Sequence, residues 1–391
     1  MKKILFGITS LTLGGAEKVL VDLANELSKK YDITILTIYA KGEFEKKLNS
    51  KVKLKSIYDF QFNDMSNFKK KLTALKLLLF KKRFYKKYIK GDYDIEIAFL
   101  EGPITRLFGV KNKNTRKIAW VHNDITLVFG KDIKAKLKVS IDKKTYGKYQ
   151  TLVFVSKDNR DKFTEIYKDV RDEYLQPVHK RVIYNYINPQ NVIEGAEEKI
   201  EDSLNDKTTT FLTVARLTKQ KAIDRIIRVH KKLIDNNFMH EFYVIGDGPE
   251  RENLEKLIQE LNVQNTFHLL GKKENPYPYM KQAQFFCLLS EFEGYGMVIE
   301  EAKILNKPII ITDTAAREAV QNYENSIIVN NNEEGIYAEI KEVLQKKIKS
   351  FSNKQEKYDN SKIITKLEKL LEEEALSLIH IWRCRRIALC R

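Results

Sequence analysis

The chain has few cysteines and no long apolar segment. Its 391 residues include only three cysteines, at positions 287, 384 and 390. Their spacing fits neither a disulfide framework nor a zinc site, so a reducing cytosol is the expected environment. No run of about 18 apolar residues is present, and we therefore expect no integral membrane protein. The apolar run Ile4–Ile8 is soon interrupted by Thr9 and Ser10, which favours a first strand over a signal peptide.

The composition is that of a folded, basic protein. Hydrophobic residues make up 43% of the chain and aromatic residues 10%, which excludes general disorder. The length is sufficient for two domains, each with its own core. The net charge of +17 indicates an anionic partner, such as nucleic acid, an acidic membrane or a phosphorylated substrate. Charge alone does not choose among the three.

The first half predicts alternating strands and helices. Lys3–Thr9 is strand-like, a helical pattern covers Ala16–Lys29, and Ile33–Ile38 is a second strand. This order predicts a parallel sheet with helices packed on it. Gly14 and Gly15 follow the first strand, at the edge where open α/β sheets bind ligands. The alternative is that the two glycines only form a tight turn.

A second α/β series follows a polar, acid-rich stretch at 187–208, which is the predicted domain boundary. Its first strand is Phe211–Ala215, and a terminal helix is predicted over Asn353–Glu374. The other predicted strands of the chain are Ile95–Leu100, Lys117–Val121, Thr151–Ser156, Phe242–Ile245, Phe285–Leu289, Lys307–Thr312 and one ending at Gly271.

The stretch from Ser290 to Leu305 combines a strand end, a glycine-rich turn and a helix expected to begin near Met297. Such a helix N-terminus presents free N–H groups and a partial positive charge to an anion, which suits a phosphate. Glu293 precedes the turn, and Glu301 lies about one turn into the helix, within reach of a ligand bound there. Glu300 is rotated by about 100° from Glu301, so only one of the pair can face the loop. The alternative is an acidic first turn that merely stabilises the helix dipole.

This stretch resembles the signature of the family-4 retaining glycosyltransferases. The matching residues are Glu293, Gly294, Tyr295, Gly296, Glu301 and Ala302. The resemblance implies that Glu301 binds the ribose of a nucleotide. It further implies that Glu293 and the backbone of the loop, through Met297, hold the donor sugar and the diphosphate.

Other segments resemble the same family in the same order along the chain. His122 follows a strand and would face the donor sugar, although it could instead only cap the strand. Arg216 and Lys221 would hold the diphosphate, with surface bases as the alternative interpretation. Asn185 matches the family's asparagine after the last strand of the first domain, and Gly271-Lys272 would lie against the base. Two departures are Ala222 and the pair Ala315-Ala316, where the family has glycines.

The resemblance implies a GT-B fold, in which two doubly wound Rossmann-like α/β domains face each other and a C-terminal helix crosses back to the first domain. We expect an acceptor domain at 1–190, a nucleotide-sugar domain at 191–350 and a crossover helix at 351–375. Residues 376–391 resemble a translated sequencing adapter and are left out of the functional interpretation.

The implied reaction moves a sugar from a nucleotide donor, expected to be a UDP-sugar, to a hydroxyl of a glycan or lipid-linked acceptor with retention of configuration. No metal and no cofactor beyond the donor is expected, and the implied pathway is synthesis of bacterial surface polysaccharide or glycolipid. A UDP-sugar epimerase of the same fold is one alternative. A basic nucleic-acid-binding protein is another, although no recognition module is evident and no nucleic-acid partner is expected.

Residues 66–90 contain ten Lys or Arg and no acid, interleaved with leucines and aromatic residues. This composition predicts a basic amphipathic helix on an anionic membrane surface, and hence a cytoplasmic protein bound peripherally to the inner face of the membrane. The alternative is a solvated helix whose apolar face packs on its own domain. The following Asp92-Tyr93-Asp94 matches a metal motif of another glycosyltransferase fold, but its place before a strand favours a strand-start turn.

Overall fold

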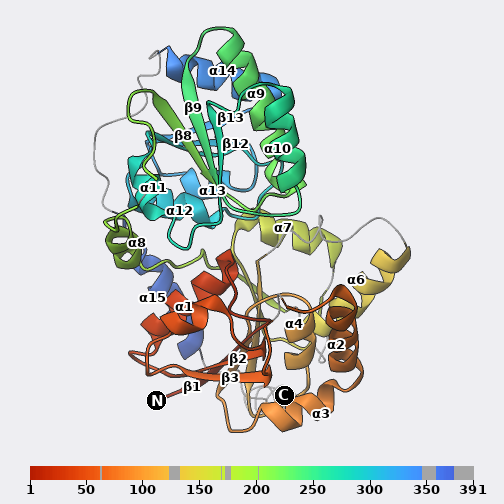
Figure 1. The fold of residues 1–391 in the computed structure, drawn as a ribbon. Coiled ribbons are helices and arrows are strands. Elements are labelled where there is room, and N and C mark those ends of the chain that lie inside the picture. Colours follow the sequence, from red (N-terminus) through yellow and green to blue (C-terminus); the bar gives the residue numbers. More distant parts are fainter. Residues whose placement is uncertain are drawn as a thin grey trace, which may run out of the picture. The chain divides into compact units, whose positions relative to one another are not determined.

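The computed structural model describes residues 1–61, 64–122, 133–168, 170–171, 178–200, 202–345 and 358–373. The chain forms two compact units (Figure 1). Unit 1 contains residues 1–155, 160–186 and the chain from 360 onward, and unit 2 contains residues 156–159 and 187–359. Residues 376–391 lie outside the described part of the chain.

Unit 1 is built on a seven-stranded parallel sheet in the order β3-β2-β1-β4-β5-β6-β7. Its strands are β1 (Lys3–Ile8), β2 (Asp32–Tyr39), β3 (Lys53–Tyr58), β4 (Ile95–Ala98), β5 (Arg116–Val121), β6 (Thr151–Phe154) and β7 (His179–Val182). Its described helices are α1 (Gly15–Leu27), η1 (Glu43–Lys47), α2 (Asn67–Leu79), α3 (Lys81–Tyr88), α4 (Pro103–Phe108), α6 (Ile133–Tyr146), α7 (Lys157–Ile166), whose first residues are grouped with unit 2, and α15 (Ser361–Glu372). The strand order reverses between β1 and β4.

Unit 2 repeats this plan with six parallel strands in the order β10-β9-β8-β11-β12-β13. Its strands are β8 (Thr209–Val214), β9 (His240–Ile245), β10 (Phe267–Gly271), β11 (Phe285–Leu288), β12 (Ile309–Thr312) and β13 (Ser326–Val329). Its helices are α8 (Pro189–Gly195), η2 (Lys219–Lys221), α9 (Ile223–Asp235), α10 (Arg251–Glu260), α11 (Tyr277–Gln282), α12 (Met297–Ile304), α13 (Arg317–Val320) and α14 (Glu333–Leu344). Here the order reverses between β8 and β11, which is where open α/β sheets form their ligand crevice.

The strands are nearly continuous apolar runs because both faces of each sheet are covered. In unit 1, Leu36, Ala119 and Phe154 lie in one buried cluster with residues from α3, α4 and α6. In unit 2, Phe211 and Phe242 pack with residues of α9, α10 and α14. Each unit therefore has its own core, and each sheet presents the carboxyl ends of its strands along one edge.

The basic segment 66–90 contains two helices instead of one. Helix α2 begins after Ser66, whose side chain accepts a hydrogen bond from the Lys69 N–H, and it ends at Phe80, where α3 follows immediately. The inner face of α3 is anchored by Tyr85, whose hydroxyl donates to Glu96 over 2.5 Å. Glu96 also pairs with Lys117 over 2.6 Å, and both charges are fully buried. Burial lowers the pKa of Lys117, while Glu96 opposes that shift.

Helix α15 belongs to unit 1, and its C-terminal end is surrounded by cations. Arg116 donates to the carbonyl of Leu370 over 2.5 Å and pairs with Glu373 over 3.1 Å. Lys2 donates to the Leu371 carbonyl over 3.0 Å. These groups satisfy carbonyls that a helix end leaves free and complement its partial negative charge. Figure 1 shows α15 beside α1, and Tyr31, just after α1, donates to Glu372 over 2.8 Å.

Candidate active site

Glu293 and Lys221 meet at the point where the strand order of unit 2 reverses. Lys221 ends η2, after β8, and Glu293 lies in the loop after the neighbouring strand β11. The Lys221 Nζ is 2.5 Å from Oε1 of Glu293, and Ser290 donates to the same oxygen over 2.5 Å. Glu293 is 6% exposed, so the pair is held away from bulk water. Within the described chain, Oε2 of Glu293 has no hydrogen-bond partner, which leaves it to accept a ligand hydroxyl.

Helix α12 begins at Met297, directly after this loop, as the sequence predicts. Gly296 precedes it with φ 77° and ψ 73°, in the left-handed region that glycine adopts without strain. A side chain at position 296 would collide with Ile299 and Leu288, each 2.9 Å from an added Cβ. Glycine has no side chain to cap the helix, and the Ile299 N–H donates to the Gly296 carbonyl over 2.9 Å, so the N–H groups of Met297 and Val298 are the ones left to an anion.

The two adjacent acids of α12 are both buried but have different partners. Glu301 accepts a hydrogen bond from the Tyr277 hydroxyl over 3.2 Å. Glu300 accepts one from Tyr295 over 2.8 Å and forms an ion pair with Lys303 over 3.0 Å. Glu300 is therefore committed to holding the loop and helix together. Tyr295 is 7% exposed, so its ring belongs to the packing of the loop.

Arg216 and the Gly271-Lys272 pair lie at the same edge of the sheet. Arg216 follows β8 with an exposed side chain that has no ion-pair or hydrogen-bond partner among the described residues. Gly271 ends β10 with φ 69°, its carbonyl accepts the Gly246 N–H over 2.9 Å, and Lys272 is exposed. Thus the predicted site residues of this half follow β8, β10 and β11, and Arg216 lies on the same β8–α9 connection as Lys221. Gly294 is half-buried within the same loop.

The two departures from the glycine pattern differ in conformation. Ala222 has φ 48° and ψ 40°, so it takes the left-handed conformation that glycine would take without cost. Ala316 has φ −59° and ψ −18°, which any residue adopts, and Ala315 and Ala316 are both buried. The loop after β12 therefore needs no glycine for its backbone geometry.

In unit 1, the predicted residues follow β1, β5 and β7. Gly14 caps α1 in an extended conformation, and Gly15 is the first helical residue and is exposed. Asn185 is 3% exposed, and its Oδ1 has no hydrogen-bond partner among the described residues. Asn123 and Asp124, which follow His122, lie outside the described residues.

His122 is held as a neutral ring. Burial lowers its pKa to about 3, although a hydrogen bond to the Phe99 backbone opposes that shift. Its Nε2 has no partner among the described residues, so the hydrogen bond to Phe99 comes from Nδ1, and Nε2 is left as an acceptor. The backbone N–H of His122 donates to Glu101 over 2.7 Å. Phe99 packs against the imidazole, with ring centroids 4.8 Å apart.

A family model described as Glycosyl transferases group 1 matches residues 195–365, which include the whole Glu293–Glu301 stretch. Over these residues, the chain belongs to this family. It is similar to a Campylobacter jejuni enzyme named N-acetylgalactosamine-N,N'-diacetylbacillosaminyl-diphospho-undecaprenol 4-alpha-N-acetylgalactosaminyltransferase, with 28% identity over 90% of this chain and 94% of the relative. A second C. jejuni relative, an alpha-1,4-N-acetyl-D-galactosaminyltransferase acting on a diNAcBac-PP-undecaprenol-linked glycan, is 27% identical over 77% of each chain.

Solved structures show the fold of this glycosyltransferase. HepE of Anabaena, crystallised with UDP and glucose, superposes with a TM-score of 0.70 at 16% identity, covering 96% of this chain and all of HepE. WaaG, a glycosyltransferase involved in lipopolysaccharide biosynthesis, gives a TM-score of 0.70 at 12% identity, covering 95% of this chain and all of WaaG. The protein is thus a GT-B glycosyltransferase, as predicted from the resemblance.

Two contacts of the site were not anticipated from the sequence. Ser290 and Tyr277 each donate to one of the site acids, Glu293 and Glu301. Ser290 lies three residues before Glu293, and that short spacing is a signal that could have identified it. Tyr277 is 24 residues from Glu301 on another helix, and nothing in the local sequence connects the two. In the described part of the chain, no group of three His, Cys, Asp or Glu residues could hold a metal ion, and no helix is long and apolar enough to cross a membrane.

Proposed function

We propose that this glycosyltransferase transfers a sugar from a UDP-sugar to a hydroxyl of a lipid-linked glycan, with unit 2 binding the donor and unit 1 the acceptor. The observation that carries the proposal is the Lys221–Glu293 pair, whose Nζ and Oε1 atoms are 2.5 Å apart. The pair lies after the carboxyl ends of the neighbouring strands β8 and β11, and α12 begins four residues after Glu293. The relatives whose names specify undecaprenol-linked acceptors, and HepE with bound UDP, support the choice of substrates.

Each part of the donor has a partner of suitable chemistry. The α12 N-terminus, Gly294 and Gly296 would bind the diphosphate through backbone N–H groups, with Arg216 as a second positive charge. Glu301 would accept hydrogen bonds from the ribose hydroxyls, and Gly271-Lys272 would lie against the base. Oε2 of Glu293 would accept a hydrogen bond from a sugar hydroxyl. Lys221 would orient that carboxylate and add positive charge beside the leaving phosphate.

In the reaction, the bond between the anomeric carbon and the UDP β-phosphate oxygen breaks, and a bond to the acceptor oxygen forms on the same face of the sugar. The electron pair leaves with UDP, where Arg216, Lys221 and the helix N-terminus stabilise the negative charge. The acceptor proton passes to a phosphate oxygen of the donor. We further propose that Gly14, Gly15 and Asn185 bind the acceptor substrate. We also propose that Nε2 of the neutral His122, which has no partner among the described residues, accepts a hydrogen bond from a hydroxyl of the donor sugar.

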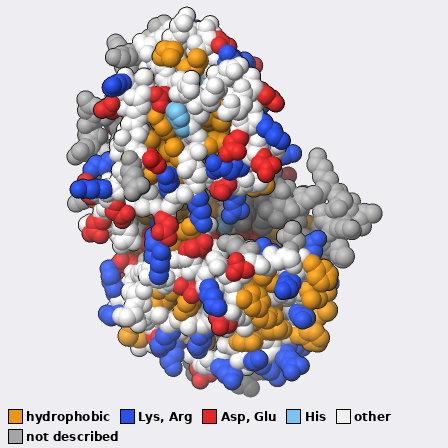
Figure 2. All heavy atoms as spheres, in the orientation of Figure 1, with side chains coloured by type: hydrophobic (Ala, Val, Ile, Leu, Met, Phe, Trp, Pro, Cys, Tyr) orange, Lys and Arg blue, Asp and Glu red, His pale blue; other side chains and the backbone are white. Residues whose placement is uncertain are grey.

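We also propose that α2 and α3 hold the enzyme on an anionic membrane, where a lipid-linked acceptor resides. The apolar side chains of this segment divide into two sets, because Leu77, Tyr85 and Ile89 are buried in unit 1. The exposed set on and just after α2 is Phe68, Leu72, Leu75, Leu79 and Phe80. Figure 2 shows hydrophobic side chains gathered with Lys and Arg over the part of unit 1 that carries these helices. An exposed apolar ridge flanked by bases is the composition of a surface that binds lipid headgroups.

A panel of nucleotide sugars tests the donor half of the proposal, with slow hydrolysis of each sugar measured in the absence of acceptor. We expect one or a few UDP-sugars to be hydrolysed, and the rate to survive excess EDTA, because fixed cations and the helix N-terminus take the place of a metal. Hydrolysis abolished by EDTA and restored by Mg²⁺ would contradict this mechanism. Conversion of the UDP-sugar to an epimer without release of UDP would favour an epimerase instead.

A further inference from the structure

The loop that carries Glu293 has its backbone fixed by side chains from other elements. Four consecutive carbonyls accept a side-chain hydrogen bond: Leu289 from Arg225 over 2.7 Å, Ser290 from Thr312 over 2.6 Å, Glu291 from Asn331 over 2.8 Å, and Phe292 from Gln220 over 3.0 Å. The carbonyl of Gln220 also accepts the Glu291 N–H over 2.9 Å. Leu289 and Ser290 are buried, so their carbonyls need partners from the protein, and here side chains supply them.

The four donors come from both sides of the loop. Gln220 lies in η2 and Arg225 in α9, both after β8. Thr312 ends β12, and Asn331 follows β13. Because β8 and β12 are the two neighbours of β11, the loop is tied across its own strand to the strands on either side. A shift of the loop in either direction would therefore break at least two of these hydrogen bonds.

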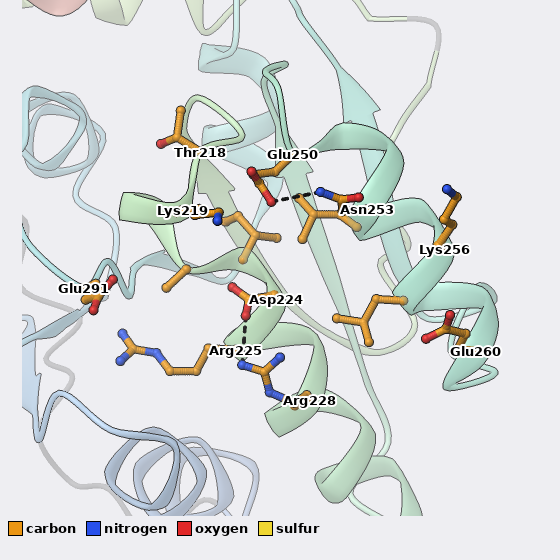
Figure 3. A pocket seen from close by; sticks show the side chains of 14 residues that line it. Thr218, Lys219, Asp224, Arg225, Arg228, Glu250, Asn253, Lys256, Glu260 and Glu291 are labelled. Atoms are coloured by element: carbon orange, nitrogen blue, oxygen red, sulfur yellow. Dashed lines mark hydrogen bonds and ion pairs between the residues drawn. The ribbon is translucent and has the colours of Figure 1, made fainter.

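Arg225 is one of the residues that line a hollow of about 600 Å³ beside α9 and α10 (Figure 3). Its side chain extends from α9 toward Glu291, away from Asp224 and Arg228, which pair with each other over 2.9 Å. The hollow is lined by bases and acids in similar number, including Lys219, Glu250 and Glu260. That mixture selects no one class of ligand. What this region contributes to the loop is the hydrogen bond from Arg225 to the Leu289 carbonyl.

We propose that Gln220, Arg225, Thr312 and Asn331 are positioning residues that fix the loop so that Oε2 of Glu293 meets the donor sugar. The proposal rests on the proposed role of Glu293. Satisfying the carbonyls of residues 289–292 keeps these four groups from competing with the carboxylate for sugar hydroxyls. A catalytic group needs its supporting contacts because small displacements of a reacting geometry reduce rates strongly.

The cleanest test is the pair Thr312→Val and Thr312→Ser, measured on the full chain with the UDP-sugar that it hydrolyses. Thr312→Val keeps the shape but removes the hydroxyl that donates to Ser290, whereas Thr312→Ser keeps the hydroxyl. We expect Val to reduce kcat about tenfold or more and Ser to restore most of it. The Kd for UDP should change less than about threefold in both, because the ribose and diphosphate partners are untouched.

A second test uses surface positions, in case Thr312→Val does not fold. Gln220→Ala removes the donor to Phe292, and its neighbour Lys219→Ala is the matched control, because the Lys219 side chain is exposed and has no hydrogen bond or ion pair to the loop among the described residues. Asn331→Ala and Asn330→Ala form a second such pair. We expect the Gln220 and Asn331 variants, but not the controls, to lower kcat and to increase deuterium uptake in peptides covering 289–296. Melting temperatures should stay within a few degrees of the parent.

The outcomes separate the two proposals. Equal kcat for Thr312→Val and Thr312→Ser, with Gln220→Ala matching Lys219→Ala, would overturn the positioning role. Glu293→Gln tests the acid itself, and an unchanged kcat for that variant would refute the proposed role of Glu293. If kcat is unchanged in Glu293→Gln while deuterium uptake rises in the Gln220 and Asn331 variants, these side chains hold the loop but do not affect catalysis. That result would also reject the positioning role.

Discussion

Glu300 and Glu301 are neighbours on α12 and are equally buried, yet their surroundings assign them different tasks. Glu300 faces Lys303 and Tyr295, which neutralise it inside the protein. Glu301 accepts a hydrogen bond from the neutral Tyr277 hydroxyl, 3.2 Å away. A rotation of about 100° between successive helical residues is the whole reason for the difference.

The substitution Glu301→Ala should reduce UDP affinity about tenfold or more, because charge-assisted hydrogen bonds to the ribose contribute roughly 1.5–3 kcal/mol. Glu300→Ala should leave UDP affinity nearly unchanged and instead lower the melting temperature, because Lys303 loses its buried partner. Glu293→Ala should reduce turnover more than UDP binding. Calorimetric titration of the three variants with UDP, alongside thermal unfolding, checks all three. Equal losses of affinity at 300 and 301 would mean that both acids only support the helix.

At the scale of elements, the histidines of α9 and β9 form a buried chain of hydrogen bonds. His230 Nδ1 and His240 Nε2 are 2.8 Å apart, His240 Nδ1 is 2.8 Å from the Phe238 carbonyl, and His230 Nε2 is 2.8 Å from Thr266 Oγ1. With both rings neutral, His240 donates to Phe238, His230 donates to His240 and Thr266 donates to His230. Burial lowers the pKa of His230 well below its usual range and that of His240 to about 4.

The two buried histidines, His230 and His240, predict that the folded protein loses stability in mild acid. The unfolded chain takes up protons near pH 6.5, whereas the folded state resists them until about pH 4, so the free energy of unfolding falls as pH drops between these values. Each histidine contributes a slope of about 1.4 kcal/mol per pH unit. The double variant His230→Gln/His240→Gln should be less stable at pH 7.5 but should lose less stability by pH 5. Thermal unfolding of both proteins at several pH values checks this, and parallel losses would contradict it.

The membrane proposal concerns α2 and α3 as elements. Changing Lys81, Lys82, Arg83, Lys86 and Lys87 to Gln should release the enzyme from anionic vesicles, since each base near the surface contributes roughly 1 kcal/mol. Binding by the parent should weaken steeply with salt. Changing Leu72, Leu75 and Leu79 to Gln should weaken binding with little loss of salt dependence, because those side chains are exposed and contribute apolar contact. Co-sedimentation with vesicles measures the binding of both variants. Unchanged binding in both would contradict the membrane proposal and favour a helical surface that is only solvated.

The sequence predicts elements well where a local pattern determines them. Strand β11 and the start of α12 follow from an apolar run and the glycine at 296, and the strand ends differ from expectation by only one or two residues. The break at Phe80 was missed because leucines and bases continue across it without Gly or Pro. The contact between Lys221 and Glu293 joins residues 72 apart, and it depends on which strands become neighbours. Local sequence carries no record of that choice, nor of the four side chains that fix the loop.

At the scale of the whole molecule, α15 connects the last described residues to the amino-terminal ends of β1 and β5 in unit 1, through Lys2 and Arg116. Arg116 is only 7% exposed, and its partners Leu370 and Glu373 both belong to the C-terminal segment. A buried guanidinium that loses its partners is costly, with a penalty of about 3–5 kcal/mol for a broken buried pair. The apolar face of α15, with Leu367, Leu370 and Leu371, is buried as well.

Two truncations should therefore behave very differently. A chain ending at residue 375 keeps α15 whole and should fold and melt as the full chain does. A chain ending at residue 360 removes α15, leaves Arg116 unpaired and exposes the surface that α15 covers, so unit 1 should unfold at a markedly lower temperature or aggregate. Circular dichroism melting of the two products checks the expectation. Equal melting curves would show that α15 contributes little.

The placement of α15 also sets an order in time. Unit 2 is nearly continuous in the chain, from Ile187 to Asp359, whereas unit 1 uses the first 155 residues and the segment from Asn360 onward. During synthesis, every strand of unit 2 is made before the helix that completes unit 1. The nascent chain therefore carries Arg116 without Leu370 and Glu373 while unit 2 is being made, so the unit that begins first is completed last.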